Sequence, residues 1–191
     1  MVTTAPSRWN VANAVTLARI ALVPFFVLAL LAEDGRSTGW RLTATAIFLL
    51  AAVTDRLDGY LARRDNLVTD LGKLLDPIAD KLLIGAGLIC LSVLGDLSWW
   101  VTVVILVREL GITAMRFMVL RYAVMPASRG GKLKTVLQVV AIALYLLPLD
   151  ELPEVVHVLA MLAMAAAVVV TLVTGADYVR QALRLRQGAR A

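Results

Sequence analysis

Four aspartates at helical spacing lie in an otherwise apolar chain, and they are the residues best suited to chemistry. They belong to the pattern D-x2-D-G-x2-A-R-x8-G-x3-D-x3-D, as Asp55, Asp58, Asp76 and Asp80. Within each pair the two aspartates are three or four residues apart, so they share one face of a helix. Carboxylates beside hydrocarbon are costly unless they bind a cation, which makes such a cluster a functional site by default.

Divalent metal is the cation that these aspartates predict. Four carboxylates with no opposing charge would repel one another. Oxygen-only ligands favour Mg²⁺ or Mn²⁺ over zinc, and a pair of ions suits displacement at phosphorus. Gly59 would let a nucleotide approach the backbone closely, and Arg63 is able to pair with a phosphate. The alternative is that the aspartates are helix caps or solvated loop charges, a description that fits Asp65 and Asp70 better.

The composition excludes an ordinary soluble domain. The chain has 191 residues, of which 60% are hydrophobic, and a mean hydropathy of +0.82. That length suits one domain, residues 1–191, with about six membrane-spanning helices of roughly 20 residues each. The net charge of +5 comes without a soluble basic domain, so we assign it to membrane topology and phosphate binding and expect no nucleic-acid partner.

Apolar runs predict an all-α integral membrane protein with six transmembrane helices. These are expected at about 13–32, 41–60, 77–95, 99–120, 133–149 and 155–178. Turn residues mark the connectors, at Asp34-Gly35, Gly95-Asp96, Gly130-Gly131 and 148–153. Gly72 and Pro77 are expected to shape entry into the third helix, since proline is tolerated in a first turn. The metal site then lies between the second and third helices.

Charge asymmetry predicts which side the site faces. The expected outer loops carry most of the acidic residues, which are Glu33, Asp34, Asp96, Asp150, Glu151 and Glu154. Most basic residues fall at the other ends, as the positive-inside rule requires of a cytoplasmic side. Both termini and the aspartates are therefore expected to be cytoplasmic in a multi-pass protein of the cell membrane. Residues 1–12 form an interfacial segment and residues 179–191 a basic cytoplasmic tail in this scheme.

Helix length places the aspartates below the membrane surface. The uninterrupted apolar runs Leu42–Thr54 and Leu82–Leu94 have 13 residues each. That is about 20 Å of helix, against a hydrocarbon core of about 30 Å. The missing turns are those that carry the aspartates, so the sequence predicts a cavity open to the cytoplasm.

The aspartate pattern resembles the signature of the CDP-alcohol phosphotransferases, membrane enzymes that replace CMP on a CDP-activated alcohol with another alcohol. The resemblance implies that Asp55, Asp58 and Asp76 hold the metals. It implies that Asp80 joins the metal site and acts as the base that deprotonates the attacking hydroxyl.

Further segments resemble the phosphatidylglycerophosphate synthases of bacteria, so that the resemblance covers residues 9–140. They are the opening from Trp9 to Arg19, Arg108-Glu109-Leu110 with Arg116, and Gly131 to Thr135 with Gln138; the opening departs from the family pattern at Ala12 and Val15. The implied substrates are CDP-diacylglycerol and glycerol 3-phosphate. The implied CDP-diacylglycerol site comprises Asn13, Thr16, Asp58, Gly59, Ala62, Arg63, Thr69 and Gly72. The implied acceptor-phosphate site comprises Arg108, Arg116, Lys132 and Lys134.

Several alternatives stay open at this stage. Helix capping alone would explain Asn13 and Thr16, and Arg108 with Glu109 forms a structural ion pair as readily as a substrate contact. Within the family, a cardiolipin synthase or a phosphatidylinositol phosphate synthase would share the fold. From another class, the chain would be a membrane scaffold or a cation transporter. A homodimer is compatible with the sequence.

Overall fold

The computed structural model describes residues 11–64, 70–119 and 129–188, with side chains described at 13–54, 75, 77–115 and 133–181. The predicted all-α class is confirmed over these residues. Six α-helices and two short 3-10 turns follow in the order α1 (Val11–Leu31), η1 (Ala32–Gly35), α2 (Thr38–Arg64), α3 (Asp70–Val93), α4 (Trp99–Val119), α5 (Arg129–Leu146), η2 (Leu149–Glu151) and α6 (Glu154–Gly188).

Several helices are longer than the hydropathy predicted. Helix α3 begins at Asp70, so Pro77 lies inside it and not in its first turn, and the prediction for Pro77 was wrong. Gly130 and Gly131 lie within α5 and not in a connector. Most of the predicted 179–191 tail continues α6. Hydropathy marks the residues that tolerate lipid, whereas backbone hydrogen bonding continues through leucine, arginine and lysine, which are good helix formers in any solvent.

Two segments are long and apolar enough to cross a membrane on length and composition. They are Asn13–Gly35, with mean hydropathy 2.3, and Glu154–Gln181, with mean hydropathy 2.5. The apolar parts Thr38–Thr54 and Leu133–Leu146 are shorter. Their shortness agrees with the truncated apolar run expected in the second helix.

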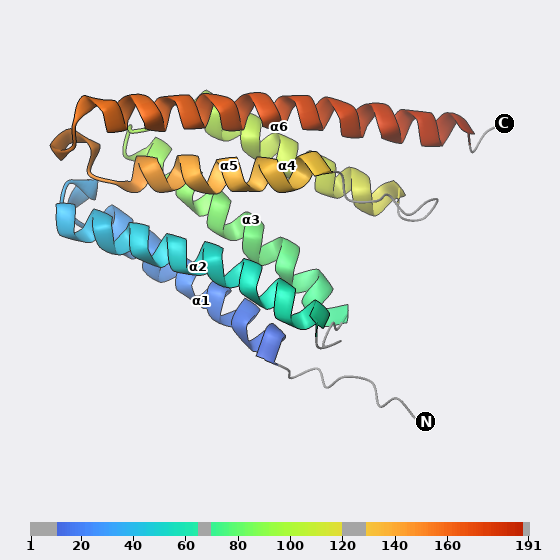
Figure 1. Cartoon of the computed structure of the whole chain (residues 1–191), viewed down its shortest axis with the longest axis horizontal. Helices are drawn as coiled ribbons and strands as arrows, with labels where there is room; N and C mark the ends of the chain where they lie inside the picture. The colour runs from blue at the N-terminus through green and yellow to red at the C-terminus, as the bar shows by residue number, and fades with distance from the viewer. Residues whose placement is uncertain (1–10, 65–69, 120–128, 189–191) are drawn as a thin grey trace.

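Helix α3 is central to the bundle. It contacts α1, α2, α4 and α5, while α6 packs on α4 and α5 (Figure 1). The α1–α2, α3–α4 and α5–α6 turns lie together at one end, which we call the turn end, and the start of α1 and the end of α6 lie toward the other (Figure 1). The start of α2, the start of α4 and η2 therefore share one end. This arrangement agrees with the prediction that the acidic connectors lie on one side.

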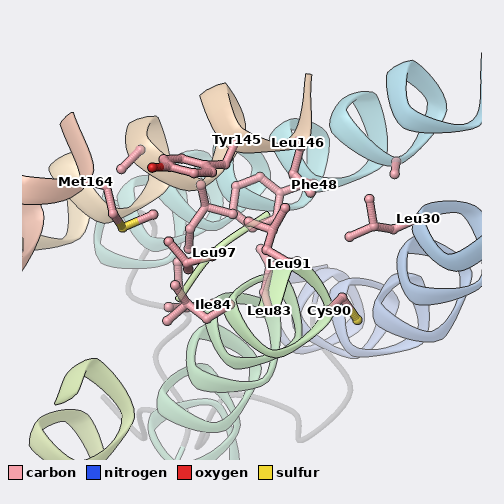
Figure 2. Close-up of a cluster of buried hydrophobic side chains, with 14 of the residues drawn as sticks. Leu30, Phe48, Leu83, Ile84, Cys90, Leu91, Leu97, Tyr145, Leu146 and Met164 are labelled. Atoms are coloured by element: carbon pink, nitrogen blue, oxygen red, sulfur yellow. The ribbon is translucent and has the colours of Figure 1, made fainter. Parts of the chain in front are cut away.

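The core lies where α3 meets α2 and α5. Phe48, Leu91 and Leu146 are fully buried there and gather in one cluster with Tyr145 (Figure 2). Gly87 allows this close packing, because a Cβ at its position would lie 2.9 Å from the Ile142 Cγ2 methyl. Ile142 is itself fully buried and has no space into which to move.

A single arginine joins the three turns at the turn end. The buried Arg41 donates to the carbonyl of Leu147 at 3.2 Å and to the carbonyl of Gly35 at 2.5 Å, and it forms an ion pair with Asp96. Gly35 has φ +68°, in the left-handed region that glycine adopts without strain. Arg41 thus neutralises Asp96 and satisfies the carbonyl of Leu147 just after the C-terminus of α5, where a cation is favourable, and also the carbonyl of Gly35.

Replacing Gly87 by leucine should destabilise the bundle, because the added side chain must displace Ile142 from a filled core. Overpacking of this kind costs about 1–3 kcal/mol. The matched control is Gly111→Leu, since nothing lies within 4 Å of a Cβ built at Gly111. Thermal unfolding in detergent should give a lower Tm for Gly87→Leu than for wild type and little change for Gly111→Leu. Equal Tm values for the two variants would contradict the close approach.

Candidate active site

A cavity between α3, α4 and α5 contains the predicted base. Its volume is about 40 Å³. Its lining combines a carboxylate from α3, a carboxylate from α4 and an amide from α5 with apolar side chains; the residues are Asp80, Lys81, Ile84, Leu106, Glu109, Leu110 and Gln138. Asp80 is partly buried. A carboxylate in such a position is accessible to a substrate and partly shielded from water.

The other predicted metal ligands lie on the helices that flank this cavity. Asp55 and Asp58 belong to α2, and Asp76 lies one turn before Asp80 on α3. Helices α2 and α3 contact each other. The side chains of these three aspartates lie outside the described residues, so their predicted metal-binding role stays a prediction.

The donor set suits Mg²⁺ or Mn²⁺ by its chemistry. All four predicted ligands supply carboxylate oxygens, the donors that hard divalent cations prefer. Among the residues whose side chains are described, no group of three or more His, Cys, Asp or Glu side chains is able to hold a metal. Only Asp80 of the four belongs to that described part.

The predicted nucleotide-binding residues fall into two groups. Asn13 and Thr16 are each only 2% exposed, and so is Arg19 one turn further along α1. Spaced three apart, the three side chains form one polar face that points into the bundle, whereas the rest of α1 is apolar. The side chains of Gly59, Ala62, Arg63 and Gly72, and all of Thr69, lie outside the described residues.

Glu109 links two of the predicted acceptor-site cations. Its Oε1 accepts from Lys134 Nζ of α5, and the same oxygen accepts from Arg108 Nη1 at 3.2 Å. The Lys134 side chain is 8% exposed and that of Glu109 is 14% exposed. The charge of Asp80 also acts on Lys134. Because a buried charge is costly alone, each of these ions depends on its partners to remain in the bundle.

Arg108 is additionally bound to α6. Its Nε donates to the Thr171 carbonyl at 3.2 Å, and its Nη2 donates to Thr174 Oγ1 at 2.8 Å. The structural ion pair that the sequence left open for Arg108 and Glu109 is therefore present. The side chains of Arg116 on α4 and Lys132 on α5, the other two predicted acceptor residues, lie outside the described residues.

The sequence prediction of the site omitted Arg19, Gln138, Thr171 and Thr174. Gln138 lines the cavity and donates to Thr171 Oγ1 at 3.0 Å. A usable signal was present, because each omitted residue lies one turn from another polar residue within an apolar helix. Polar residues at such spacing in a membrane segment face the bundle and not lipid.

Comparison with known proteins matches this arrangement to one family. The sequence model of the CDP-alcohol phosphatidyltransferases matches residues 9–173. A protein of Mycobacterium tuberculosis named probable phosphatidylglycerophosphate synthase is 54% identical over 92% of this chain and 82% of its own length. The CDP-diacylglycerol–glycerol-3-phosphate 3-phosphatidyltransferase of Bacillus subtilis is 38% identical over 89% of this chain and 93% of its own length.

A protein of the same name from Escherichia coli is 38% identical over 71% of this chain and 76% of its own length. The match of the family model spans the polar face of α1, the aspartate pattern and the Glu109–Lys134 pair. The chain belongs to the CDP-alcohol phosphatidyltransferase family.

Proposed function

We propose that this chain is a membrane-embedded CDP-diacylglycerol–glycerol-3-phosphate 3-phosphatidyltransferase. It transfers the phosphatidyl group of CDP-diacylglycerol to glycerol 3-phosphate and produces phosphatidylglycerophosphate and CMP. The observation that carries this proposal is the similarity, over most of both chains, to relatives named for that activity in different bacteria.

The cavity contains the groups that such a transfer needs. Asp80 takes the proton of the acceptor hydroxyl while the hydroxyl oxygen forms a bond to the phosphatidyl phosphorus. The bond from that phosphorus to the CMP oxygen breaks, and CMP leaves with the electron pair. General-base assistance of this kind contributes about 10²–10⁴-fold to the rate, so Asp80 is the residue on which turnover depends most.

Binding of the two substrates falls to different helices. Lys134, with Arg116 and Lys132, supplies the positive charge that contacts the phosphate of glycerol 3-phosphate, and Arg108 adds positive charge next to Lys134 through their shared partner Glu109. Asn13 and Thr16 of α1 contact the cytidine nucleotide, together with the residues of the aspartate pattern. Lys134 is paired with the anionic Glu109, so its charge is kept in place before an anionic substrate arrives.

Mg²⁺ or Mn²⁺ would be held by Asp55, Asp58, Asp76 and Asp80. When bound, the ions would neutralise the pyrophosphate and the leaving group. The aspartates in turn keep their positions through α2 and α3, which contact each other along the bundle.

All six helices cross the membrane in this proposal, and the site faces the cytoplasm. The turn end carries exposed Glu33, Asp34 and Glu151, and the exposed Trp99 and Trp100 lie where an aromatic belt is expected. Asp80 lies in the half of α3 that is farther from the turn end. A lipid substrate is thereby able to stay in the bilayer while its headgroup reaches Asp80.

A competition assay tests the function. Purified protein with CDP-diacylglycerol should release CMP and consume labelled glycerol 3-phosphate in preference to phosphatidylglycerol or inositol phosphate. Consumption of phosphatidylglycerol alone would identify a cardiolipin synthase instead. Absence of CMP release with every acceptor would favour the scaffold or transporter alternatives.

Asp80→Asn should lower kcat by about 10²–10⁴-fold, because the amide keeps the shape of the carboxylate but accepts no proton. Asp55→Asn and Asp76→Asn should instead weaken metal binding, since each loses an anionic oxygen ligand. Titrating Mg²⁺ or Mn²⁺ against CMP release should partly rescue the latter two variants and not Asp80→Asn. The same metal response in all three variants would contradict this division of roles.

Cysteine labelling should reveal the orientation. In a Cys90→Ala background, which removes the only native cysteine, Glu154→Cys marks the turn end and Arg180→Cys the opposite end; both native residues are exposed. A membrane-impermeant maleimide should label Glu154→Cys on intact cells and Arg180→Cys only after permeabilisation. The background protein should stay unlabelled, and the reverse pattern would place the cavity on the outer side.

A further inference from the structure

Helix α6 carries a polar stripe that the aspartate pattern does not include. Thr171, Thr174 and Tyr178 are buried, with exposed fractions of 0%, 9% and 6%. They recur three and four residues apart, so they share one face of the helix. We call these three residues, with Gly175 between them, the α6 seam. It lies in α6, whose apolar segment has the higher mean hydropathy of the two long apolar segments. Polar groups in such a segment usually mark a functional site.

The α6 seam fixes the Arg108 guanidinium in one orientation. The Thr174 hydroxyl donates to the Val170 carbonyl at 2.7 Å, which leaves its oxygen free to accept from Arg108 Nη2 at 2.8 Å. Nε of Arg108 donates to the Thr171 carbonyl. The Tyr178 ring lies 5.8 Å from Arg108 Cζ, within the range of a cation–π interaction.

Gly175 lets the arginine reach these partners. A Cβ at Gly175 would lie 3.2 Å from Arg108 Cγ and 3.4 Å from Arg108 Nε. Any larger residue would therefore press on the side chain just where it crosses α6. Gly175 therefore leaves the space that Arg108 needs to reach Thr171 and Thr174.

The orientation of Arg108 is transmitted to the cavity through a shared oxygen. Arg108 and Lys134 both donate to Oε1 of Glu109, so a displacement of the guanidinium moves the acceptor that holds the Lys134 amine. A second connection leads from Thr171 Oγ1 to Gln138, which lines the cavity one turn along α5 from Lys134.

We propose that the α6 seam positions the cations of the acceptor site, and that Arg108 is a positioning residue that acts through Glu109 on Lys134. This inference rests on the proposed function, because it assigns Lys134 to the acceptor phosphate. Three nitrogens of Arg108 are each engaged with a protein oxygen, and its side chain is only 10% exposed. The guanidinium therefore serves the protein, and the ammonium of Lys134 serves the substrate.

The experiment measures both KM values in purified Thr174→Val and Gly175→Ala. Losing a hydrogen bond to a charged group should raise the KM for glycerol 3-phosphate about five- to tenfold, while the KM for CDP-diacylglycerol stays within about twofold. Thr174→Ser keeps the hydroxyl and should restore the wild-type value. Thr102→Val is the matched control, because it removes a buried interhelical hydroxyl that contacts Ser92 Oγ at 2.7 Å, and neither residue lines the cavity. It should lower Tm without changing the ratio of the two KM values.

Two results would overturn the inference. If Thr174→Val and Gly175→Ala lower Tm like Thr102→Val but leave the KM ratio at the wild-type value, the seam serves stability alone. If Thr174→Ser behaves like Thr174→Val, the hydroxyl is not the group that matters. Wild-type protein that does not consume glycerol 3-phosphate would refute the proposed function itself and the inference with it. That result differs from an active wild type with unaffected variants, which refutes the seam alone.

Discussion

Buried charge within an apolar bundle is the constraint on which the rest of this structure depends. Glu109 satisfies it at the cavity by accepting from Lys134 and Arg108 with one carboxylate oxygen. Removing one partner of such a group leaves an uncompensated ion in a medium that solvates it poorly, at a cost of about 3–5 kcal/mol. Because the three ions come from α4 and α5, and Arg108 also binds α6, helix packing and site geometry are set by the same contacts.

Two groups of buried or partly buried charges, one around Arg41 and one around Glu109, satisfy this constraint in different ways. At the turn end, Arg41 is paired with Asp96 and its remaining donors bind backbone carbonyls, so the group holds three turns together. Near the middle of α3 and α4, Asp80 and Glu109 share a cavity of about 40 Å³ with Gln138. The Arg41 charge is neutralised by Asp96 and bound by backbone carbonyls, whereas Asp80 and Glu109 place carboxylates around a cavity. For that reason we assign the proposed chemistry to the cavity lined by Asp80 and Glu109.

Much of the fold and part of the site were predictable from the sequence. Apolar runs predicted six helices, since hydropathy reflects burial and lipid contact, but they placed Pro77 in a first turn that lies seven residues upstream, at Asp70. The spacing of the aspartates predicted Asp80 as a site residue, and it lines the cavity. The α6 seam was not predicted, because the partners of Thr171 and Thr174 lie on helices distant in sequence. Local periodicity reports a buried polar face and does not say which helix it meets.

The most direct test of the central claim is a double-mutant cycle at Glu109 and Lys134, with Tm and turnover measured on the same samples. Glu109→Gln should destabilise the protein more than Lys134→Met, because it leaves both Lys134 and Arg108 without their carboxylate, whereas Glu109 keeps Arg108 as its partner after Lys134→Met. The double variant should be more stable than Glu109→Gln alone, because only Arg108 then lacks its carboxylate, and it should recover none of the turnover, since Lys134 no longer supplies its ammonium. Additive losses of stability would show that the two residues are not coupled. Wild-type turnover in the double variant would show that the pair serves only the fold.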